Sequence, residues 1–342
     1  MTRTTFAIVG LGMAVGPHAK SFLDLADRAE IRYAYSPSAA RREAFAARFP
    51  FPLAPDLETI LNDPAVDAVA VLTPPNTHLE LVQRCAAAGK HVLLEKPLEI
   101  TASRAQRLVE ACRTAGVTLG VVLQHRFRPS ALRLKALLDS GALGAIAGAS
   151  TSIRLWRPQG YYDEPGRGTK ARDGGGVLLT QGIHTLDLML SLAGPADEVT
   201  AYATTTALHR METEDLVAGA VRFANGAIGT IDATTAAYPG FPERIELICA
   251  HATAVLSGTA LDLFWHDGRH DRIDPDASPG GTGADPMAFP NDWHRALIAD
   301  FIDAVAEKRP PRVSGVDALR VQALIEGLLR SASEGRPVRL DP

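Results

Sequence analysis

The sequence predicts two domains: an α/β domain with a doubly wound parallel sheet, followed by an α+β domain with a mostly antiparallel open sheet and helices on one face. Three observations support this fold class. The chain has 342 residues, enough for about two domains of ~150 residues. Short apolar runs alternate with helical patterns over the first 125 residues, and strand-like runs follow one another afterwards. We therefore expect domains at residues 1–125 and 126–342.

Five short runs in the first domain are rich in Val, Ile, Leu and aromatic residues without polar alternation, which is typical of parallel strands buried on both faces. They are residues 6–9, 31–35, 68–72, 91–94 and 117–123. Helical patterns lie near residues 17–29, 38–49, 77–89 and 101–115. Thr77 and Thr101 are suited to N-caps, while Gly89 and Gly116 stand where helices end. This βαβ rhythm implies right-handed crossovers.

The second domain begins with a helix near residues 129–140, a strand at 145–155 and a longer helix at 177–192. Further strands are predicted at residues 198–206, 216–223, 227–233, 244–249 and 253–257. Asn225-Gly226 lies between two of them and predicts a hairpin with a type I′ turn. Residues 266–286 predict an exposed loop, and helices near 292–307 and 316–332 follow it.

The composition excludes several classes of protein. Hydrophobic residues make up 46% and charged residues 22%, which excludes a disordered chain. With 35 Lys and Arg against 39 Asp and Glu, no basic excess favours nucleic acid as a partner. No apolar run reaches ~18 residues and the N-terminus lacks a signal-like segment, so we expect no membrane partner and a cytoplasmic location. Three well-separated cysteines do not suggest a disulfide framework.

A glycine turn, Gly10-Leu11-Gly12-Met13-Ala14-Val15-Gly16, directly follows the first strand. Gly10 and Gly12 permit a tight turn and the close approach of a pyrophosphate to a helix N-terminus. Val15 stands where the third glycine of G-x-G-x-x-G usually lies, and a glycine turn without a ligand is the alternative. The strand before it and the helix after it favour a dinucleotide cofactor and hence a Rossmann domain.

The end of the second strand normally selects between NAD and NADP, because an acid there binds the adenosine ribose hydroxyls. This chain has Ser36 instead of an acid, and Arg41 and Arg42 follow. A small hydroxyl with nearby arginines accommodates a 2′-phosphate, although the two arginines also suit a solvated helix face. The cofactor is therefore NADP or NAD, with a slight preference for NADP.

Polar motifs also follow the third and fourth strands. Thr73-Pro74-Pro75-Asn76-Thr77-His78 follows one, and Glu95-Lys96-Pro97 follows the other. Ligands of open α/β sheets bind at the carboxyl ends of the strands, where both motifs fall. A loop lysine is usually a surface charge, but here Pro97 also restricts the backbone of Lys96.

A second constellation lies on the helix that follows three glycines at 174–176. At about 100° per residue, Thr180, His184, Asp187 and Ser191 fall within about 60° of one another. A polar stripe on an otherwise apolar helix must find partners or line a cavity. The alternative is a histidine satisfied within the core.

Aromatic and arginine side chains flank that helix in sequence and suit a carbohydrate pocket. They are Arg126, Trp156, Arg157, Tyr161 and Arg167. Ordinary loop and strand-edge residues are the alternative. The His- and Asp-rich stretch from His266 to Asp276 has no tight zinc spacing, so we expect a solvated loop and no metal.

In order and spacing these motifs resemble the glucose–fructose oxidoreductase/inositol dehydrogenase (Gfo/Idh/MocA) family over nearly the full length. The most specific matches are Glu95-Lys96-Pro97 and the glycine-rich segment with His184. The resemblance implies an NAD(P)-dependent oxidoreductase that transfers a hydride between nicotinamide and a secondary alcohol or ketone of a sugar, cyclitol or sugar derivative. It also implies a homodimer or homotetramer. An NAD-dependent glycosidase acting by transient oxidation and a non-catalytic dinucleotide- and sugar-binding regulator remain alternatives.

The resemblance also implies roles for individual residues. Lys96 corresponds to the catalytic lysine beside the nicotinamide, Glu95 supports the cofactor, and His184 exchanges the hydroxyl proton while Asp187 orients it. Most members carry an acid four residues before the histidine, where this chain has Thr180. Thr180 can form hydrogen bonds but cannot hold a charge. Thr180-Gln181 resembles the Asn-Gln of a branch that acts on sugar-nucleotide acids.

The predicted site residues fall into three groups. The catalytic candidates are Lys96, Thr180, His184 and Asp187. The cofactor-binding candidates are Gly10, Gly12, Met13, Ser36, Arg41, Thr73, Pro74, Asn76, His78, Glu95, Lys96 and Pro97. The substrate-binding candidates are Lys96, Arg126, Trp156, Arg157, Tyr161, Arg167, Thr180, Gln181 and His184.

Overall fold

The computed structural model describes residues 3–274 and 291–340 and divides into two compact units. Unit 1 contains residues 1–124 and 290–319, and unit 2 contains residues 125–289 and 320–342. The first boundary lies beside the predicted one at residue 125. The second does not follow the prediction of a continuous second domain, because residues 290–319 pack with unit 1.

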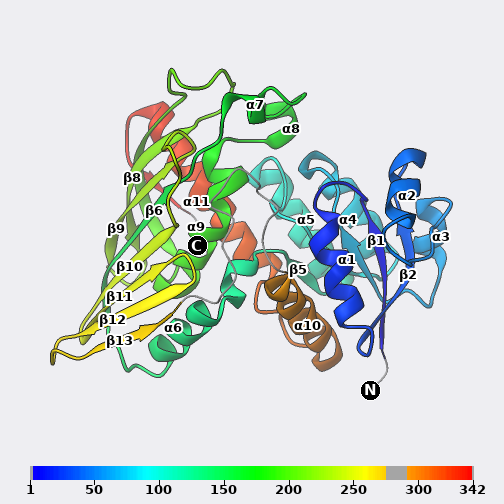
Figure 1. The fold of residues 1–342 in the computed structure, drawn as a ribbon, viewed down its shortest axis with the longest axis horizontal. Coiled ribbons are helices and arrows are strands. Elements are labelled where there is room, and N and C mark those ends of the chain that lie inside the picture. The colour runs from blue at the N-terminus through cyan, green and yellow to red at the C-terminus, as the bar shows by residue number, and fades with distance from the viewer. Residues whose placement is uncertain (1–2, 275–290, 341–342) are drawn as a thin grey trace. The chain divides into compact units, whose positions relative to one another are not determined.

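Unit 1 is built on a parallel sheet of five described strands (Figure 1). These are β1 (Thr4–Val9), β2 (Ala29–Tyr35), β3 (Ala68–Val71), β4 (His91–Leu94) and β5 (Leu119–Val121), in the order β2-β1-β3-β4-β5. All four residues of β3 are buried, which explains why its sequence lacks polar alternation. Leu53 also forms an isolated parallel bridge with Ala34 of β2. Counting this bridge as a strand gives the Rossmann order, so the predicted doubly wound sheet is confirmed.

The first helices of unit 1 are α1 (Val15–Asp24), α2 (Ala39–Ala46), α3 (Leu57–Asn62), α4 (His78–Ala87) and α5 (Ala102–Ala115). Thr101 caps α5 by accepting a hydrogen bond from the Arg104 amide, as predicted, and Gly116 ends it with φ of 68°. Thr77 occupies the N-cap position of α4, as predicted, but its side chain makes no cap bond there. α3 was not predicted, since six residues are too short for a periodic signal.

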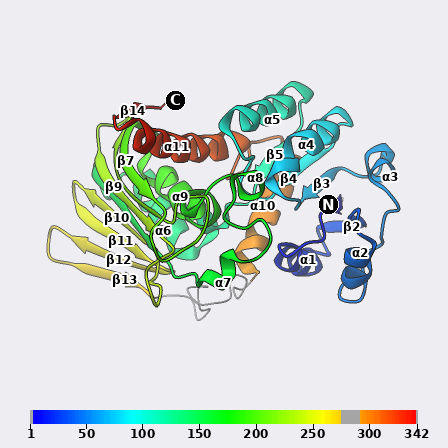
Figure 2. The same cartoon turned by 90° about the horizontal axis from the view of Figure 1, so that it is seen from above.

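Helix α10 (Asp292–Glu307) completes unit 1 from the far end of the sequence and lies beside α1 in both views (Figures 1 and 2). The Phe301 ring lies 6.0 Å from that of Phe6 on β1. A Cβ at Gly120 of β5 would lie 2.6 Å from the Phe301 ring, so this glycine makes room for the helix. These apolar contacts explain why residues 290–319 belong to unit 1 and correct the predicted continuous second domain.

Unit 2 contains a sheet of nine described strands in the order β13-β12-β11-β10-β6-β9-β8-β7-β14. Their bounds are β6 (Ile146–Arg154), β7 (Ala196–Thr204), β8 (Leu216–Phe223), β9 (Ile228–Thr234), β10 (Arg244–Cys249), β11 (Ala252–Ser257), β12 (Ala260–Trp265), β13 (His270–Ile273) and β14 (Val338–Arg339). All neighbours are antiparallel except β6 and β9, which confirms the mostly antiparallel sheet. The loop predicted for 266–286 is wrong at β13, and residues 275–290 lie outside the described residues.

The turn between β8 and β9 is a hairpin, but not of the predicted type. A type I′ turn needs positive φ at both central residues. Gly226 has φ of 88°, whereas Asn225 is not in the left-handed region. The Gly226 amide donates to the Phe223 carbonyl at 2.9 Å, and the Ala227 amide donates to the Asn225 side chain at 3.0 Å. The asparagine side chain therefore closes a longer turn that ends in a glycine.

Helices lie on one face of the unit 2 sheet (Figure 2). They include α6 (Pro129–Asp139), a π-helical turn at Leu178–Gly182, α9 (Ile183–Ala193) and the second part of α11 (Gly315–Glu334). Two short helices, α7 (Gln159–Tyr162) and α8 (Lys170–Asp173), precede the π-helical turn. The stretch Lys170–Ala193 is apolar enough to span a membrane by composition, but 78% of its most apolar window is buried, as in a core helix.

Candidate active site

The turn after β1 is shaped to bind a dinucleotide. Gly10 has φ of 104°, and a Cβ there would lie 2.6 Å from the Leu72 carbonyl group at the end of β3. A Cβ at Gly12 would meet no atom within 4 Å, so this face of the turn is open. Nothing in the first turn of α1, all of which is described, is acidic, and no side chain caps its N-terminus. The helix amides and dipole therefore remain available to a pyrophosphate.

The end of β2 differs in detail from the prediction. Ser36 is almost fully buried, and its Oγ accepts a hydrogen bond from the Ser38 amide at 3.4 Å. Arg42 donates to the Ser36 carbonyl at 2.6 Å. Arg41 is exposed at the start of α2. The Ser36 hydroxyl thus faces its own turn, and the roles of Ser36 and Arg41 in cofactor binding stay predictions.

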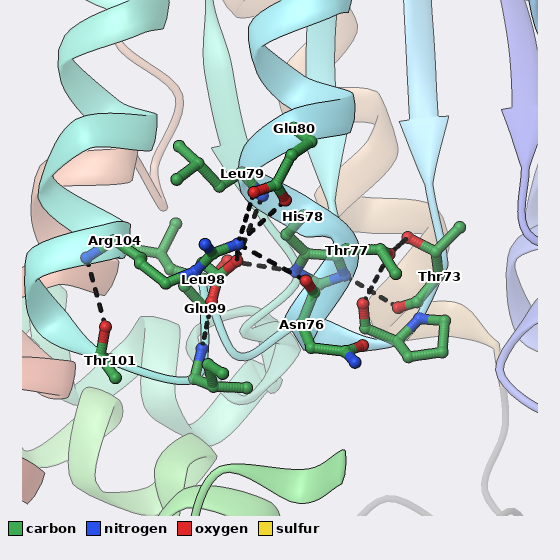
Figure 3. Close-up of polar contacts among 12 residues, drawn as sticks. Thr73, Asn76, Thr77, His78, Leu79, Glu80, Leu98, Glu99, Thr101 and Arg104 are labelled. Carbon is green, nitrogen blue, oxygen red and sulfur yellow. Dashed lines mark hydrogen bonds and ion pairs between the residues drawn. The ribbon is translucent and has the colours of Figure 1, made fainter. Parts of the chain in front are cut away.

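The Thr73–His78 segment follows β3, next to β1 in the sheet (Figure 3). The His78 ring is fully buried, with Nε2 2.8 Å from the Thr73 carbonyl and Nδ1 3.1 Å from the Pro97 and Leu98 carbonyls. His78 therefore joins the loop after β3 to the loop after β4, and its role in cofactor binding stays a prediction. Thr73 is half-buried, and Pro74 and Asn76 are exposed at this edge.

Behind the loop after β4 lies a buried carboxylate that the sequence did not indicate. Glu99 has no exposed surface and accepts from the Leu79 amide at 3.3 Å and the Ile100 amide at 2.7 Å. Arg104 Nη2 lies 2.7 Å from Glu99 and 2.9 Å from Glu80, and Figure 3 shows it between the two. These hydrogen bonds to Glu80 hold the pKa of its carboxyl below the usual range. The network fixes the chain directly after Pro97.

The Glu95-Lys96-Pro97 motif lies where β4 ends. The Glu95 Oε2 atom lies 3.2 Å from Nε2 of His18, a fully buried residue of α1. Lys96 is half-buried, Pro97 is buried, and the peptide bond between them is cis. Since the ends of β1, β3 and β4 lie along one edge of the parallel sheet, the motif shares that edge with the glycine turn.

In unit 2, the three glycines permit the approach of another chain segment. A Cβ at Gly176 would lie 1.8 Å from the Glu214 carbonyl oxygen. The Glu214 side chain accepts from the Gly176 amide at 3.0 Å and the Leu178 amide at 3.3 Å. Burial raises the pKa of this carboxyl. Glu214 thus caps, from a loop, the helix formed by the π-helical turn and α9, which we call the site helix. No local sequence signal indicated this role.

The site helix is not uniform, which changes the predicted polar stripe. The π-helical turn at Leu178–Gly182 contains Thr180 and Gln181, so the spacing of about 100° per residue fails between Thr180 and His184. The Thr180 hydroxyl donates to the Gly176 carbonyl at 2.7 Å and also contacts the Gln181 side chain. Asp187 keeps its predicted α-helical spacing after His184.

Asp187 forms a buried ion pair one turn after His184. Arg126 donates to it through Nε at 2.7 Å and Nη2 at 2.6 Å. Asp187 is fully buried, and the bidentate contact satisfies both of its oxygens. The structure thus brings two predicted site residues together, although as partners of each other. The roles of Asp187 toward His184 and of Arg126 toward a substrate stay predictions.

The His184 ring lies against that of His125, with centroids 4.9 Å apart and planes inclined by 33°. Arg128 Nη2 lies 2.6 Å from His125 Nε2, and Glu243 lies 3.6 Å from His125 Nδ1. Sequence reasoning missed all three of these residues. Only the proximity of His125 and Arg128 to Arg126 along the chain could have suggested two of them.

Two guanidinium groups converge on Tyr161, so several of the predicted substrate residues lie together. Arg167 lies over the Tyr161 ring at 4.3 Å and donates to its hydroxyl at 2.9 Å. Arg157 lies 5.7 Å from the same ring, and Gln181 Nε2 is 3.4 Å from the hydroxyl. Arg157 is buried, and its Nε has no hydrogen-bond partner among the described residues. The cluster can hold an anionic or hydroxyl-rich group.

Trp156 lies beside this cluster but packs elsewhere. Its ring lies 5.6 Å from Tyr238 and 6.2 Å from His209. His209 is buried and bonds to Asp215 at 2.7 Å and to the Arg157 carbonyl at 2.8 Å. This dyad was not predicted: His209 and Asp215 lie close together between β7 and β8, but no recognisable motif marks the pair. Both ring nitrogens of His209 are engaged in these contacts, so His209 positions the backbone of Arg157.

The His- and Asp-rich stretch near β13 forms pairs at the surface. His270 Nε2 lies 2.9 Å from Asp262, and Trp265 donates to Asp271 at 2.8 Å. Asp276 lies outside the described residues. Within residues 3–274 and 291–340, no three His, Cys, Asp or Glu side chains are placed to hold a metal ion.

The sequence matches two family models. Residues 4–123 match the oxidoreductase family with an NAD-binding Rossmann fold (GFO_IDH_MocA), and residues 131–255 match the GFO/IDH/MocA C-terminal domain. The myo-inositol 2-dehydrogenase of Thermotoga maritima is 28% identical over 294 residues, covering 84% of this chain and 83% of that protein. The scyllo-inositol 2-dehydrogenase (NADP(+)) IolW of Bacillus subtilis is 32% identical over 198 residues, covering 57% of this chain and 53% of that protein.

A solved structure covers the whole chain. The WlbA dehydrogenase from Bordetella pertussis, in complex with NADH and UDP-GlcNAcA, has a TM-score of 0.85 at 29% identity and covers 100% of both chains. The glycine turn fits the dinucleotide that this fold binds, since Gly10 excludes a side chain where Gly12 leaves open space. By the two family models, and in agreement with this geometry, the chain belongs to the Gfo/Idh/MocA family and is an NAD(P)-binding oxidoreductase.

Proposed function

We propose that this oxidoreductase interconverts a secondary alcohol and a ketone on a sugar that carries an anionic group, such as a sugar acid or its nucleotide derivative. The observation that carries the proposal is the Tyr161 cluster. Two arginines, one of them buried, converge there beside Gln181, three residues before His184. Forked guanidinium groups bind carboxylates and phosphates in bidentate fashion. The similarity to a dehydrogenase solved with UDP-GlcNAcA supports the same substrate class.

In this proposal Lys96 and His184 handle the substrate hydroxyl. Lys96 donates a hydrogen bond to the oxygen as negative charge develops on it. His184 accepts the hydroxyl proton during oxidation and returns it during reduction, since an imidazole with an ordinary pKa of ~6.5 exchanges protons near neutral pH. The bound nicotinamide supplies or accepts the hydride. Glu95, held by His18, keeps the Lys96 loop in place.

The experiment is a substrate panel of neutral sugars, cyclitols, sugar acids and nucleotide-linked sugar acids, each assayed with NAD and NADP by cofactor absorbance. We expect the highest kcat/KM for an acid-bearing sugar. Substituting Arg167→Gln or Arg157→Gln should raise KM for that substrate and leave KM for the cofactor unchanged. A neutral cyclitol as the best substrate, with no effect of either substitution, would refute the anionic class. Release of an aglycone without net cofactor reduction would instead indicate a glycosidase.

For the cofactor we propose a preference for NADP over NAD. The turn after β2 has no acid to bind a ribose diol, and Arg41 is exposed at the start of α2, where a 2′-phosphate would be attracted. An Arg41→Ala enzyme should lose affinity for NADPH about tenfold and keep its affinity for NADH, because only NADPH has the 2′-phosphate. Fluorescence titration with both cofactors measures this, and equal losses would contradict the preference.

We also propose a homo-oligomer located in the cytoplasm. Large apolar side chains are exposed on several strands of the unit 2 sheet, and a second copy would cover them. They include Tyr202, Ile228, Ile248 and Phe264. Light scattering coupled to size exclusion would give the number of subunits, and a monomer at micromolar concentration would contradict the proposal.

A further inference from the structure

We infer that His125, held by Arg128 and Glu243, is a positioning residue that fixes the orientation of His184 and disfavours a positive charge on its ring. The inference rests on the proposed role of His184 as the proton acceptor. It concerns residues outside the motifs described so far, all of them within unit 2. His125 lies in the 3-10 turn Gln124–Phe127, Arg128 directly follows that turn, and Glu243 immediately precedes β10.

The contact with Arg128 determines the tautomer of His125. A guanidinium group has only donors, so Arg128 Nη2 must donate to His125 Nε2 across their 2.6 Å contact. Nε2 therefore carries a lone pair, and the ring proton is on Nδ1. Nδ1 faces the Glu243 carboxylate at 3.6 Å. His125 is thus a neutral ring whose tautomer is set by Arg128, with the Nδ1 proton on the side of the Glu243 carboxylate.

The buried Arg128 guanidinium places a positive charge next to the His125 ring. The Arg128 side chain is only 10% exposed, and its Nη1 donates to the Gly258 carbonyl at 3.2 Å. Glu243 lies 3.4 Å from Nη2 and is itself mostly buried, so it offsets the cation in part. Arginine keeps its proton in proteins. A further positive charge on His125 or His184 beside this buried cation is unfavourable.

His125 also contacts His184 directly. The two rings have centroids 4.9 Å apart at an inclination of 33°, so His125 packs against the His184 ring. Both His125 and Arg128 are less than a tenth exposed. The neutral His125 ring is held in place, so it limits the rotation of the His184 ring. It adds no charge beside His184. The fixed ring and the buried cation behind it together disfavour the protonated form of His184.

The remaining charged groups on the elements around His184 fall into two sets. Near the helix are the Arg126–Asp187 ion pair and the Glu214 carboxylate at its start. On α6, β6 and β10, charged side chains pair at the surface. These pairs are Lys135–Asp139, Arg154–Asp232 and Arg244–Glu246. The test below leaves all but one of these groups unchanged.

The test is the dependence of kcat/KM on pH for the oxidation reaction. On the acidic limb of this profile, kcat/KM falls as His184 takes up a proton. Glu243→Gln leaves Arg128 without its counter-charge, so the limb should move to lower pH by about one pH unit. Arg128→Met removes the cation and should move the limb to higher pH by a similar amount. The double variant should return close to the native profile. Glu246→Gln, which removes an exposed carboxylate from β10, is the matched control and should leave the limb unchanged.

Opposite shifts are the decisive result, because a loss of structure alone would lower activity without moving the limb in both directions. Shifts of the same sign, or none in variants with native circular dichroism, would overturn the inference. If Arg128→Met does not fold, NMR of the native enzyme labelled in its histidine rings decides. His125 must then show the Nδ1–H tautomer and no titration from about pH 5 to 8. Full turnover by His184→Asn would instead refute the proposed function.

Discussion

At Gly10 and Gly12 the same substitution should have two different outcomes. A Cβ at Gly10 would lie 2.6 Å from the Leu72 carbonyl at φ of 104°, whereas one at Gly12 meets no atom within 4 Å. We expect Gly10→Ala to lower the free energy of unfolding by about 3 kcal/mol. Gly12→Ala should change it by less than about 1 kcal/mol but weaken dinucleotide binding, because the methyl group occupies the space the pyrophosphate approaches.

Urea unfolding and cofactor fluorescence titration separate the two effects. The Gly10→Ala variant should be impaired in both measurements, and Gly12→Ala in the titration alone. Native affinity of Gly12→Ala for both NADH and NADPH would show that the open face of the turn is not where the cofactor lies.

Lys96 is the residue on which turnover should depend most. Lys96→Ala removes the donor to the developing oxyanion and should lower kcat by about a thousandfold. Cofactor affinity should stay within about threefold, because the glycine turn and helix amides hold the dinucleotide. The matched control is Lys135→Ala, which removes a surface lysine paired with Asp139 on α6. Native turnover by Lys96→Ala would remove this residue from the mechanism.

At the scale of elements, the contact between α1 and α10 should make stability depend on pH. His294 of α10 is buried edge-on against His18 of α1, with ring centroids 5.0 Å apart. Burial and the neighbouring His18 lower the pKa of His294 well below its ordinary value. Below about pH 6.5 the unfolded chain therefore binds a proton that the folded chain does not. The contribution of His294 is present above that pH and is lost as the pH falls.

We expect the free energy of unfolding to fall below pH 6.5 by up to about 1.4 kcal/mol per pH unit from His294 alone. Urea unfolding at a series of pH values measures the slope. His294→Phe should reduce it, and His266→Gln, which replaces an exposed histidine, should not. An unchanged slope in His294→Phe would mean that the buried ring is already protonated in the native state.

Elements were predictable where a local pattern determines them. Residues 91–94, 216–223, 244–249 and 292–307 form β4, β8, β10 and α10 with the predicted bounds. The π-helical turn at Leu178–Gly182 was not predictable, because distant contacts stabilise its extra residue. One of these is the Glu214 carboxylate, which accepts hydrogen bonds from the Gly176 and Leu178 amides. β13 was missed because its sequence, His270–Ile273, is mostly polar and pairs at the sheet edge.

The same distinction holds for the candidate site. The glycine turn and the Arg157–Tyr161–Arg167 cluster were predicted, because each lies in one short segment with a recognisable composition. The partners of His184 and Arg157 were not. Glu243 reaches Arg128 across 115 positions, and Asp215 supports Arg157 through His209. A single sequence contains no signal for pairs that only the tertiary fold brings together.

At the scale of the whole molecule, residues 290–319 should decide whether unit 1 folds. A fragment of residues 1–124 lacks α10 and leaves Phe6 and Gly120 without Phe301. We expect it to unfold without cooperativity in urea, as followed by circular dichroism. Joining residues 1–124 to 290–319 through a flexible linker should restore a cooperative transition. A cooperative and equally stable 1–124 fragment would contradict this division of the chain.

The late return of α10 to the first unit has a consequence for synthesis on the ribosome. The face of the β-sheet that Phe301 covers is translated at the start, but its cover emerges only after 165 intervening residues, 125–289, have been made. At about 5–20 residues per second, the nascent chain exposes this apolar surface for roughly ten seconds or more. Every described strand of the unit 2 sheet except β14 is translated before α10. We therefore expect the order of folding to be inverted relative to the order of translation, with residues 1–124 as the part of the nascent chain that chaperones shield longest.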